Sequence, residues 1–290
     1  MIPKTLINNT ATAYVLAKYL QEFCQQVGVD KYLTSPVRLQ HGNGTGGFGF
    51  KGVGNPHKRL SASGNNDCTK ERFRGITDSL DLTFRTIDKI KFRTASCVNL
   101  VERSKTVHRI EHTEELIDLY LEFELEYIIG NKPFTPNELA KFVLQRTLVC
   151  LIEQKEQKAK GTFTADIPFS KYSNKVFYEG TDVSEYTKAQ LLELTAKEFA
   201  SVFAEVDKYD WSKEVTAKHK KLIATGGHHS LPPLDIAVKY SNDAFNLLKY
   251  YYHYQLAQLT DPNENLTYYN EALAQKYNEW KAQNEKLSMA

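Results

Sequence analysis

Residues 41–75 read HGNGTGGFGFKGVGNPHKRLSASGNNDCTKERFRG, and no other part of the chain is as distinctive in composition. This glycine-rich stretch holds nine of the chain's 15 glycines, and its charged residues are mostly Lys and Arg. Glycine loses more backbone entropy on folding than any other residue, so such a run is kept where the backbone approaches something closely or needs positive φ. At 35 residues it also exceeds ordinary connections. The pattern favours a phosphate-binding loop or an arm laid on a neighbouring subunit.

Positive charge is concentrated in and around the glycine-rich stretch. The 290-residue chain has a formal net charge of +2. Residues 38–109 contain 14 Lys and Arg against six Asp and Glu, a net charge of +8, while residues 1–37 carry +1 and residues 110–290 therefore −7. Such asymmetry indicates an anionic partner on the basic side. The alternative is internal neutralisation, in which the basic third packs against the acidic remainder.

RNA or single-stranded DNA is the anionic partner that this composition suits. Lys and Arg neutralise phosphates, and aromatic side chains stack on the bases of single strands. The predicted nucleic-acid-binding residues are Phe48, Phe50, Lys51, Lys58, Arg59, Lys70, Arg72, Arg74, Lys89, Lys91 and Arg93. The competing interpretation is an extended arm that contacts neighbouring protein.

The glycine pattern does not match the common nucleotide-binding motifs. Gly47 and Gly52 have the spacing of a Walker loop, but Val53 and Gly54 stand where Lys and Ser or Thr are required. The Gly-x-Gly-x-x-Gly pattern that begins at Gly42 lacks the preceding strand and following helix of a dinucleotide site. We therefore predict no cofactor.

A metal-dependent nuclease is the enzymatic alternative. Such an enzyme gathers carboxylates around a metal ion, and the chain offers Asp88, Glu122, Glu124 and Asp166. None of them completes the full motif. His108 and His112 are four residues apart, so they would share one face of a helix and could bridge a metal there. The sequence favours a non-enzymatic protein and no metal.

The spacing of the cysteines is typical of a protein from a reducing compartment. The four cysteines, Cys24, Cys68, Cys97 and Cys150, are spread singly, which predicts reduced thiols. No apolar run approaches the roughly 18 residues of a membrane span, and the N-terminus lacks the regions of a secretory signal. We expect a cytoplasmic or virion protein with no signal peptide and no membrane partner.

Secondary structure in the N-terminal half is predicted as a helix followed by strands. Residues 8–27 have helical periodicity and end at Gly28, and Pro36 breaks the segment 32–39. Residues 76–110 have a β texture, with a strand at 89–93 that places Ile90 and Phe92 inward. Residues 98–107 are predicted to extend the sheet.

Residues 119–129 alternate at period two, which indicates a strand despite their helix-forming composition. Its acidic row, Glu122, Glu124 and Glu126, would then face the basic row of Lys89, Lys91 and Arg93.

The C-terminal half is predicted to be mostly helical. Capping patterns begin helices at Thr135 and Thr187, the first running to about residue 158. Residues 162–178 are predicted to form a short hairpin or strands, and residues 211–224 a helix. Two long helices, 234–259 and 262–287, form a closing antiparallel hairpin. This hairpin carries more tyrosines than one buried stripe can hold, so we predict a protein interface at Tyr250, Tyr251, Tyr254, Tyr277 and Trp280.

The predicted fold class is α+β, with a small mixed or antiparallel sheet in the N-terminal half and a helical C-terminal half. The predicted regions are 1–130, basic and glycine-rich, and 131–290, mainly helical; one continuous domain is the alternative. The predicted function is a non-enzymatic subunit of a larger assembly, such as a nucleoprotein, coat or effector-backbone subunit, that forms homo-oligomers and binds nucleic acid. The alternatives are the nuclease and a purely structural assembly protein such as a virion component.

Overall fold

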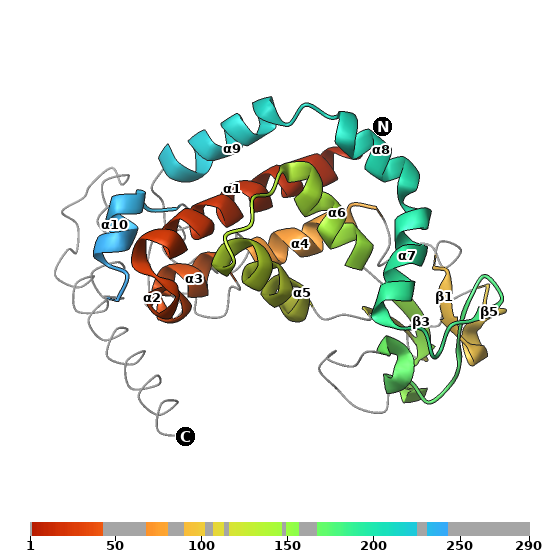
Figure 1. The fold of residues 1–290 in the computed structure, drawn as a ribbon. Helices are drawn as coiled ribbons and strands as arrows, with labels where there is room; N and C mark the ends of the chain where they lie inside the picture. The colour runs from red at the N-terminus through yellow and green to blue at the C-terminus, as the bar shows by residue number, and fades with distance from the viewer. Residues whose placement is uncertain are drawn as a thin grey trace, which may run out of the picture. The chain divides into compact units, whose positions relative to one another are not determined.

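The computed structural model describes residues 2–42, 68–80, 90–101, 107–112, 116–146, 149–156, 167–224 and 231–242 (Figure 1). The chain forms two compact units, each built from three separate segments. The first unit comprises Met1–Tyr14, Arg72–Leu125 and Pro133–Trp211, and the second Val15–Glu71, Glu126–Lys132 and Ser212–Ala290. All strands of the described sheet belong to the first unit.

The N-terminal helix α1 (Lys4–Val27) confirms the helix predicted for residues 8–27 and begins four residues earlier. Leu16, Leu20 and Phe23 are fully buried, in keeping with their helical spacing. The helix ends at Gly28, whose φ of +83° lies in the region that glycine adopts without steric cost. The predicted stop signal is therefore correct.

Two short helices follow, α2 (Val29–Thr34) and α3 (Pro36–His41). Ser35 separates them, because its hydroxyl donates to the Tyr32 carbonyl over 2.8 Å and accepts the Arg38 N–H over 3.2 Å. Pro36 suits the first turn of α3, where its missing N–H would have no helical partner. The break predicted at Pro36 is confirmed.

Helix α4 (Thr69–Asp78) occupies the end of the glycine-rich stretch. The prediction of a loop up to Gly75, and of β structure from Ile76, was wrong here. Lys, Glu and Arg are good helix formers, and Phe73 and Ile76, three residues apart, are both fully buried. The helical signal was hidden by the glycines that precede it.

Gly75 allows α4 to approach α1 within the first unit. A Cβ atom at this position would lie 2.5 Å from Asn9 Cγ. The Asn9 side chain is held in place, since its Nδ2 donates to the Thr5 carbonyl over 2.9 Å and its Oδ1 accepts from Arg72 Nη1 over 3.2 Å. A glycine inside a helix is thus explained by close packing.

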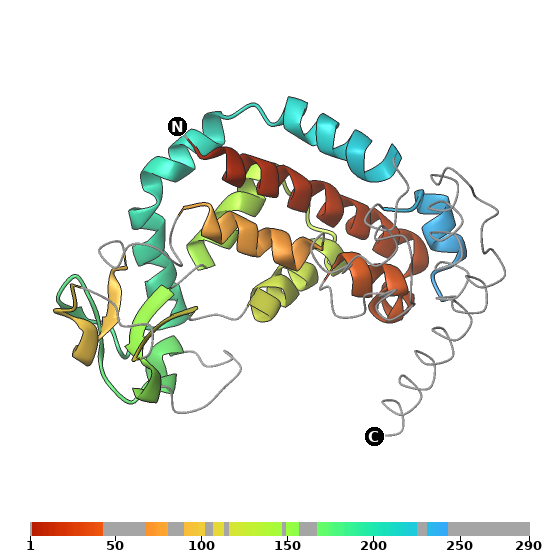
Figure 2. The ribbon, with the colours of Figure 1, turned by 180° about the vertical axis from the view of Figure 1, so that it is seen from behind.

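The strands form one mixed sheet in the order β2-β3-β1-β4-β5 within the described residues. Their bounds are β1 (Phe92–Thr94), β2 (His108–His112), β3 (Val149–Glu153), β4 (Val176–Tyr178) and β5 (Thr181–Asp182). Strands β1 and β3 are parallel, with Phe92 opposite Cys150, and lie side by side in Figure 2. The other neighbouring strands are antiparallel. Short 3-10 helices flank the strands: η3 (Ala95–Cys97), η5 (Gln154–Glu156) and η6 (Pro168–Lys171).

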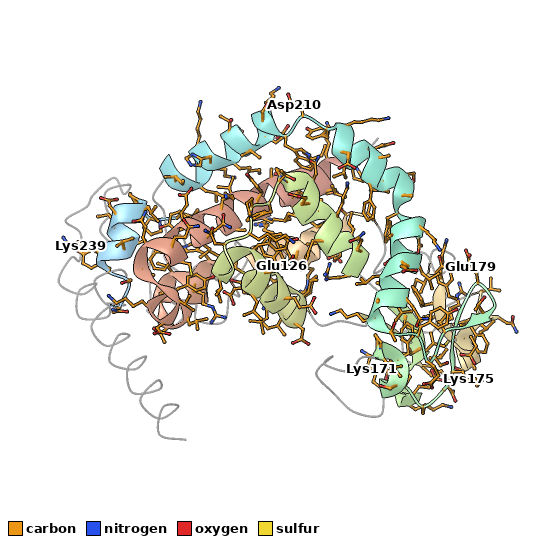
Figure 3. The ribbon with its side chains drawn as sticks, viewed as in Figure 1. Glu126, Lys171, Lys175, Glu179, Asp210 and Lys239 are labelled. Atoms are coloured by element: carbon orange, nitrogen blue, oxygen red, sulfur yellow. The ribbon has the colours of Figure 1, made fainter. Side chains whose placement is uncertain are left out.

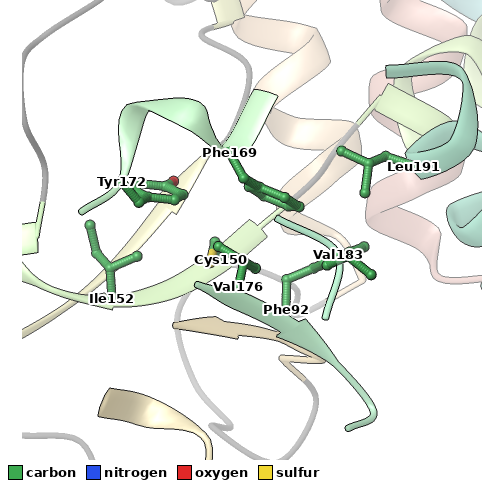
Figure 4. Close-up of a cluster of buried hydrophobic side chains, with 8 residues drawn as sticks. All are labelled: Phe92, Cys150, Ile152, Phe169, Tyr172, Val176, Val183 and Leu191. Atoms are coloured by element: carbon green, nitrogen blue, oxygen red, sulfur yellow. The ribbon is translucent and has the colours of Figure 1, made fainter. Parts of the chain in front are cut away.

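Buried side chains cover both faces of β3. Figure 4 shows the cluster on one face, which consists of Phe92, Cys150, Ile152, Phe169, Tyr172, Val176, Val183 and Leu191. On the other face Leu151 packs with Ile90 and Cys97. Ile90 and Phe92 are both buried, as predicted, but they pack on opposite faces of the sheet, because β1 begins at Phe92 and Ile90 precedes it.

The helix predicted to run from residue 135 to 158 is wrong beyond Arg146. Helix α6 (Pro136–Arg146) begins with the predicted capping box, in which Thr135 N–H donates to Glu138 Oε2 over 2.7 Å and Glu138 N–H donates to Thr135 Oγ1 over 3.2 Å. Strand β3 follows instead of more helix. A strand buried on both faces is apolar throughout, so its sequence resembles that of a buried helix.

The strand predicted at 119–129 is also wrong, because this segment is helical. Helix α5 (Leu116–Phe123) continues into the π-helix η4 (Glu124–Ile129). Leu119, Tyr120 and Phe123 are buried on one side of α5. Helix-forming Leu and Glu residues outweighed the period-two alternation.

The acidic row of this segment therefore does not form cross-strand pairs with β1. Glu122 Oε2 accepts from Arg146 Nε over 3.1 Å, and Glu124 Oε1 accepts from the Tyr120 hydroxyl over 2.7 Å. Glu126 forms an ion pair with Lys132. These contacts are local or come from neighbouring helices.

A buried carboxylate joins β1, β3 and the turn before β4. Glu156 is 1% exposed. Its carboxylate accepts from Thr94 Oγ1 and Ser96 Oγ, each over 2.6 Å, from Glu153 N–H over 2.9 Å and from Asn174 Nδ2. Burial raises the pKa of this carboxyl, but the four hydrogen bonds outweigh it and the net pKa is lowered.

Strands β4 and β5 form a hairpin, later in the chain than the one predicted at 162–178, of which residues 162–166 lie outside the described part. Its two turn residues, Glu179 and Gly180, have φ values of +48° and +88°. Two positive φ values are the mark of the type I′ turn, whose twist matches that of the strands.

The helices that follow agree with the predictions at their starts. Helix α7 (Lys188–Glu198) begins with the predicted Thr187–Gln190 capping box and is followed after Phe199 by α8 (Ala200–Lys208). Helix α9 (Ser212–Ala224) confirms the helix predicted at 211–224. Helix α10 (Leu234–Lys239) begins as predicted but ends at Lys239, not at residue 259. The rest of the predicted helical hairpin lies outside the described residues.

The fold is a mixture of helix and sheet and, in its described part, is mostly helical. This confirms the coarse fold class. Strands β3, β4 and β5 lie beyond residue 131, so the sheet draws on both halves of the sequence.

We expect Gly75→Ala to destabilise the protein by about 1–3 kcal/mol, the usual range for overpacking. The direction of the change in unfolding free energy is informative, because helix propensity alone would make Ala more stable than Gly by about 1 kcal/mol. Chemical denaturation measures the change. The double variant Gly75→Ala, Asn9→Ala removes the obstructing amide and should recover part of the loss. A Gly75→Ala variant as stable as the wild type contradicts the close approach of α4 and α1.

We expect Glu156→Gln to destabilise the protein at pH 7 by about 1–3 kcal/mol, because the new amide turns a donor toward groups that are themselves donors. A carboxyl whose folded-state pKa is lowered stabilises the fold above its unfolded pKa, and this stabilisation is lost as pH falls through the folded pKa. The difference between variant and wild type should therefore shrink in acid. Urea unfolding at neutral and acidic pH measures it, with Glu153→Gln as the control. A difference independent of pH would rule out an ionised Glu156.

Candidate nucleic-acid interface

Helices α3 and α4 cap each other at the two ends of residues 43–67. Lys70 N–H donates to the Gly42 carbonyl over 3.1 Å, and the Thr69 hydroxyl donates to the His41 carbonyl over 3.1 Å. The last carbonyls and first N–H groups of a helix have no partners within it. One pair of contacts therefore satisfies the end of α3 and the start of α4. We call His41, Gly42, Thr69 and Lys70 the junction.

The junction is buried except for the partly exposed side chain of Lys70. His41 is 2% exposed, and Cys68 and Thr69 are fully buried. Burial raises the pKa of the Cys68 thiol, which disfavours the reactive thiolate. Gly42 and Cys68, the described residues that flank residues 43–67, thus lie at one packed point of the second unit.

Basic residues lie at the junction and along α4. Lys70 and Arg74 are four residues apart and share one side of the helix. Lys70 Nζ lies 3.7 Å from Glu71 Oε1, and Arg74 is exposed. Arg72 instead contacts Asn9 of α1. The structure therefore brings two of the three predicted α4 ligands together on one side.

Lys91 contacts acidic groups of its own unit. Its Nζ lies 3.1 Å from Glu179 Oε1 and 3.9 Å from Glu198 Oε1, and 5.6 Å from the centre of the Tyr178 ring. The hydrogen bond that Lys91 donates to Glu179 raises the pKa of Lys91, and burial raises the pKa of Glu198. Figure 3 shows Glu179 at the tip of the sheet region. These two carboxylates balance the charge of Lys91.

Arg93 contacts backbone carbonyls. Its Nε donates to Ile90 over 2.9 Å, and its Nη1 donates to Leu100 over 2.9 Å and to Val98 over 3.4 Å. The guanidinium thereby fixes the chain on both sides of β1. Lys91 and Arg93, predicted to bind nucleic acid, both have partners that explain them structurally.

No group of three or more His, Cys, Asp or Glu residues able to hold a metal ion occurs in the described part of the chain. His108 and His112 lie on strand β2, not on a helix, so their backbone positions are about 13 Å apart. The helical arrangement considered for them was wrong. Of the other nuclease candidates, Asp88 and Asp166 lie outside the described residues.

Sequence reasoning missed the cluster around Lys91. Glu198 comes from α7 and Glu179 from the hairpin turn, more than 80 residues from Lys91 in the chain. Gly180 after Val176–Tyr178 indicated a turn, but Glu179 before it is not one of the residues typical of a type I′ hairpin. Nothing in the sequence indicated that the turn would meet β1.

The remaining predicted residues lie outside the described part of the chain. They are Phe48, Phe50, Lys51, Lys58, Arg59 and Lys89 of the nucleic-acid set, and Tyr250, Tyr251, Tyr254, Tyr277 and Trp280 of the interface set. Their roles stay predictions.

Comparison with known proteins gives no relative. No family model, curated protein or solved structure matches the chain. None of the described helices has the length and apolar character that a bilayer crossing requires.

We expect Glu198→Gln to gain stability relative to the wild type as pH rises. Burial raises the folded-state pKa of Glu198, so the folded protein binds the proton more tightly than the unfolded chain. Wild-type stability is then highest below the unfolded pKa and falls as pH rises through the folded pKa. Unfolding measured from acidic to neutral pH tests this. Glu179→Gln is the control, because Glu179 is largely exposed; an equal trend in both variants contradicts a burial effect at Glu198.

Proposed function

We propose that the protein is a non-enzymatic subunit of a larger assembly that binds RNA or single-stranded DNA through the glycine-rich stretch and the adjoining side of α4. The supporting observation is the junction. It ties together the two ends of a long, cationic, glycine-rich segment at one buried point of the fold. Connections longer than about 12–15 residues are uncommon in compact domains and are usually functional or linkers.

The composition of residues 43–67 suits a single-stranded ligand. The segment has seven glycines, which permit close backbone approach, and three Lys or Arg against one Asp. In this proposal Phe48 and Phe50 stack on bases. The phosphate ligands are Lys51, Lys58, Arg59, Lys70 and Arg74.

The contacts of the other basic residues assign them a structural role in this proposal. Arg72 contacts α1, Lys91 contacts two carboxylates and Arg93 contacts three carbonyls. Moving these groups onto phosphate would leave those partners without their donors. The aromatic residues from Tyr250 to Trp280 are proposed to contact neighbouring subunits, because Tyr and Trp are favoured at interfaces.

We expect the variant Lys51→Ala, Lys58→Ala, Arg59→Ala to bind a fluorescein-labelled oligouridine at least tenfold more weakly than the wild type. Each phosphate contact to a single strand contributes about 0.7 to the slope of log affinity against log salt, so the slope should fall in magnitude by about 2. Fluorescence anisotropy at several salt concentrations measures both quantities, and a thymidine oligomer distinguishes DNA from RNA.

The matched control is Lys197→Ala, Lys208→Ala, Lys213→Ala, which removes the same charge from exposed lysines of α7, α8 and α9. It should retain the wild-type slope. Equal weakening in both variants indicates nonspecific charge attraction and contradicts the assignment. A wild type that binds neither oligomer at low salt rejects the proposed function.

A further inference from the structure

Strand β2 lies at one edge of the sheet, with β3 as its strand neighbour in the described part of the chain. The register places His108 opposite Glu153, and therefore Val107 opposite Gln154. Gln154 N–H donates to the Val107 carbonyl over 2.9 Å, so these two residues form a hydrogen-bonded pair. This contact therefore determines which residues of β2 direct their backbone N–H and C=O groups toward β3, which we call the backbone phase.

Hydrogen-bonded and non-hydrogen-bonded pairs alternate along an antiparallel ladder. Arg109 and Glu111 are two and four residues beyond Val107, so their N–H and C=O groups point toward β3. The backbone groups of His108, Ile110 and His112 then point to the opposite side, at the edge. Such a row is a template for pairing with another strand.

The sequence of β2, His-Arg-Ile-Glu-His, is complementary to its own reverse. In antiparallel pairing with a second copy centred on Ile110, Arg109 stands opposite the partner's Glu111, and Glu111 opposite the partner's Arg109. Opposite charges at facing positions stabilise a strand pair and like charges destabilise it. Centring the pair on Arg109 or on Glu111 would place two like charges opposite each other.

We infer that β2 pairs antiparallel with the β2 strand of a second copy of this chain, about a two-fold axis at Ile110. This register fits the backbone as well as the charges. Ile110 exchanges hydrogen bonds with its own copy, and His108 exchanges them with the partner's His112 on either side, about six bonds in all. Val107, which directly precedes the strand, is 47% exposed and adds apolar surface at each end.

The β2 pairing adds to the proposed function by naming one surface through which subunits contact each other. The pairing itself is inferred from the strand, and only its role within a larger assembly rests on the proposed function. A pairing of like surfaces closes as a dimer about its axis. Further growth of an assembly needs a second surface. The test is made without nucleic acid, so its failure is distinguishable from a failure to bind RNA or DNA.

Sedimentation equilibrium of the full chain tests the pairing. We expect a concentration-dependent dimer whose association constant falls at least tenfold in Arg109→Glu and in Glu111→Arg, because each change puts like charges opposite each other. The double variant Arg109→Glu, Glu111→Arg restores opposite charges and should restore the dimer. A wild type that stays monomeric, single reversals that leave association unchanged, or a double variant that fails to recover overturns the inference.

A proline pair tests the backbone phase. Ile110→Pro removes an N–H that points to the edge, so the variant should fold, lose the dimer and lose less thermal stability than Arg109→Pro. Arg109→Pro removes an N–H that points to β3, so it should lower thermal stability. If Ile110→Pro folds and still dimerises as the wild type does, or if both variants are equally unstable, the assigned phase is wrong.

Discussion

The mutual capping of α3 and α4 is the constraint on which the functional account depends. The carbonyls of His41 and Gly42 and the donors of Thr69 and Lys70 are groups that a helix cannot satisfy within itself. Their burial makes leaving them without partners costly. The chain therefore returns to the same point after 25 intervening residues, although holding together two points so far apart in sequence costs entropy. A glycine-rich, cationic segment is in this way held by a folded base at both ends.

The sheet depends on a second polar contact, the buried carboxylate of Glu156. Its hydrogen bonds join β1, through Thr94 and Ser96, to the end of β3 and to Asn174 before β4. They fix the strands that place Lys91 beside two carboxylates and Arg93 beside three carbonyls. They also fix β3, against which β2 is aligned. Lys91 and Arg93 thus contact groups of their own unit, and the proposal assigns nucleic-acid binding to the glycine-rich stretch and α4.

Local signals in the sequence predicted the fold best. The capping boxes at Thr135 and Thr187 and the stop at Gly28 depend on a few adjacent residues, and all three were correct. Strand β3 was read as helix because burial on both faces removes the alternation that marks a strand. Segment 119–129 was read as a strand because its apolar and acidic residues alternate at period two. The burial instead follows the helix, since Glu124 is 1% exposed and Leu125 is 62% exposed. Apart from the Glu153 N–H, the partners of Glu156 and Lys91 lie about 20 to more than 100 residues away along the chain, so no local pattern could reveal them.

The central claim is that the segment closed by the junction is where nucleic acid binds. Photocrosslinking of the full chain to an oligouridine that contains 4-thiouridine, followed by peptide mass spectrometry, locates the contact directly. The account predicts crosslinks within residues 43–74, concentrated at Phe48 and Phe50, and their loss at high salt. Crosslinks concentrated in residues 110–290, or spread evenly along the chain, would contradict it.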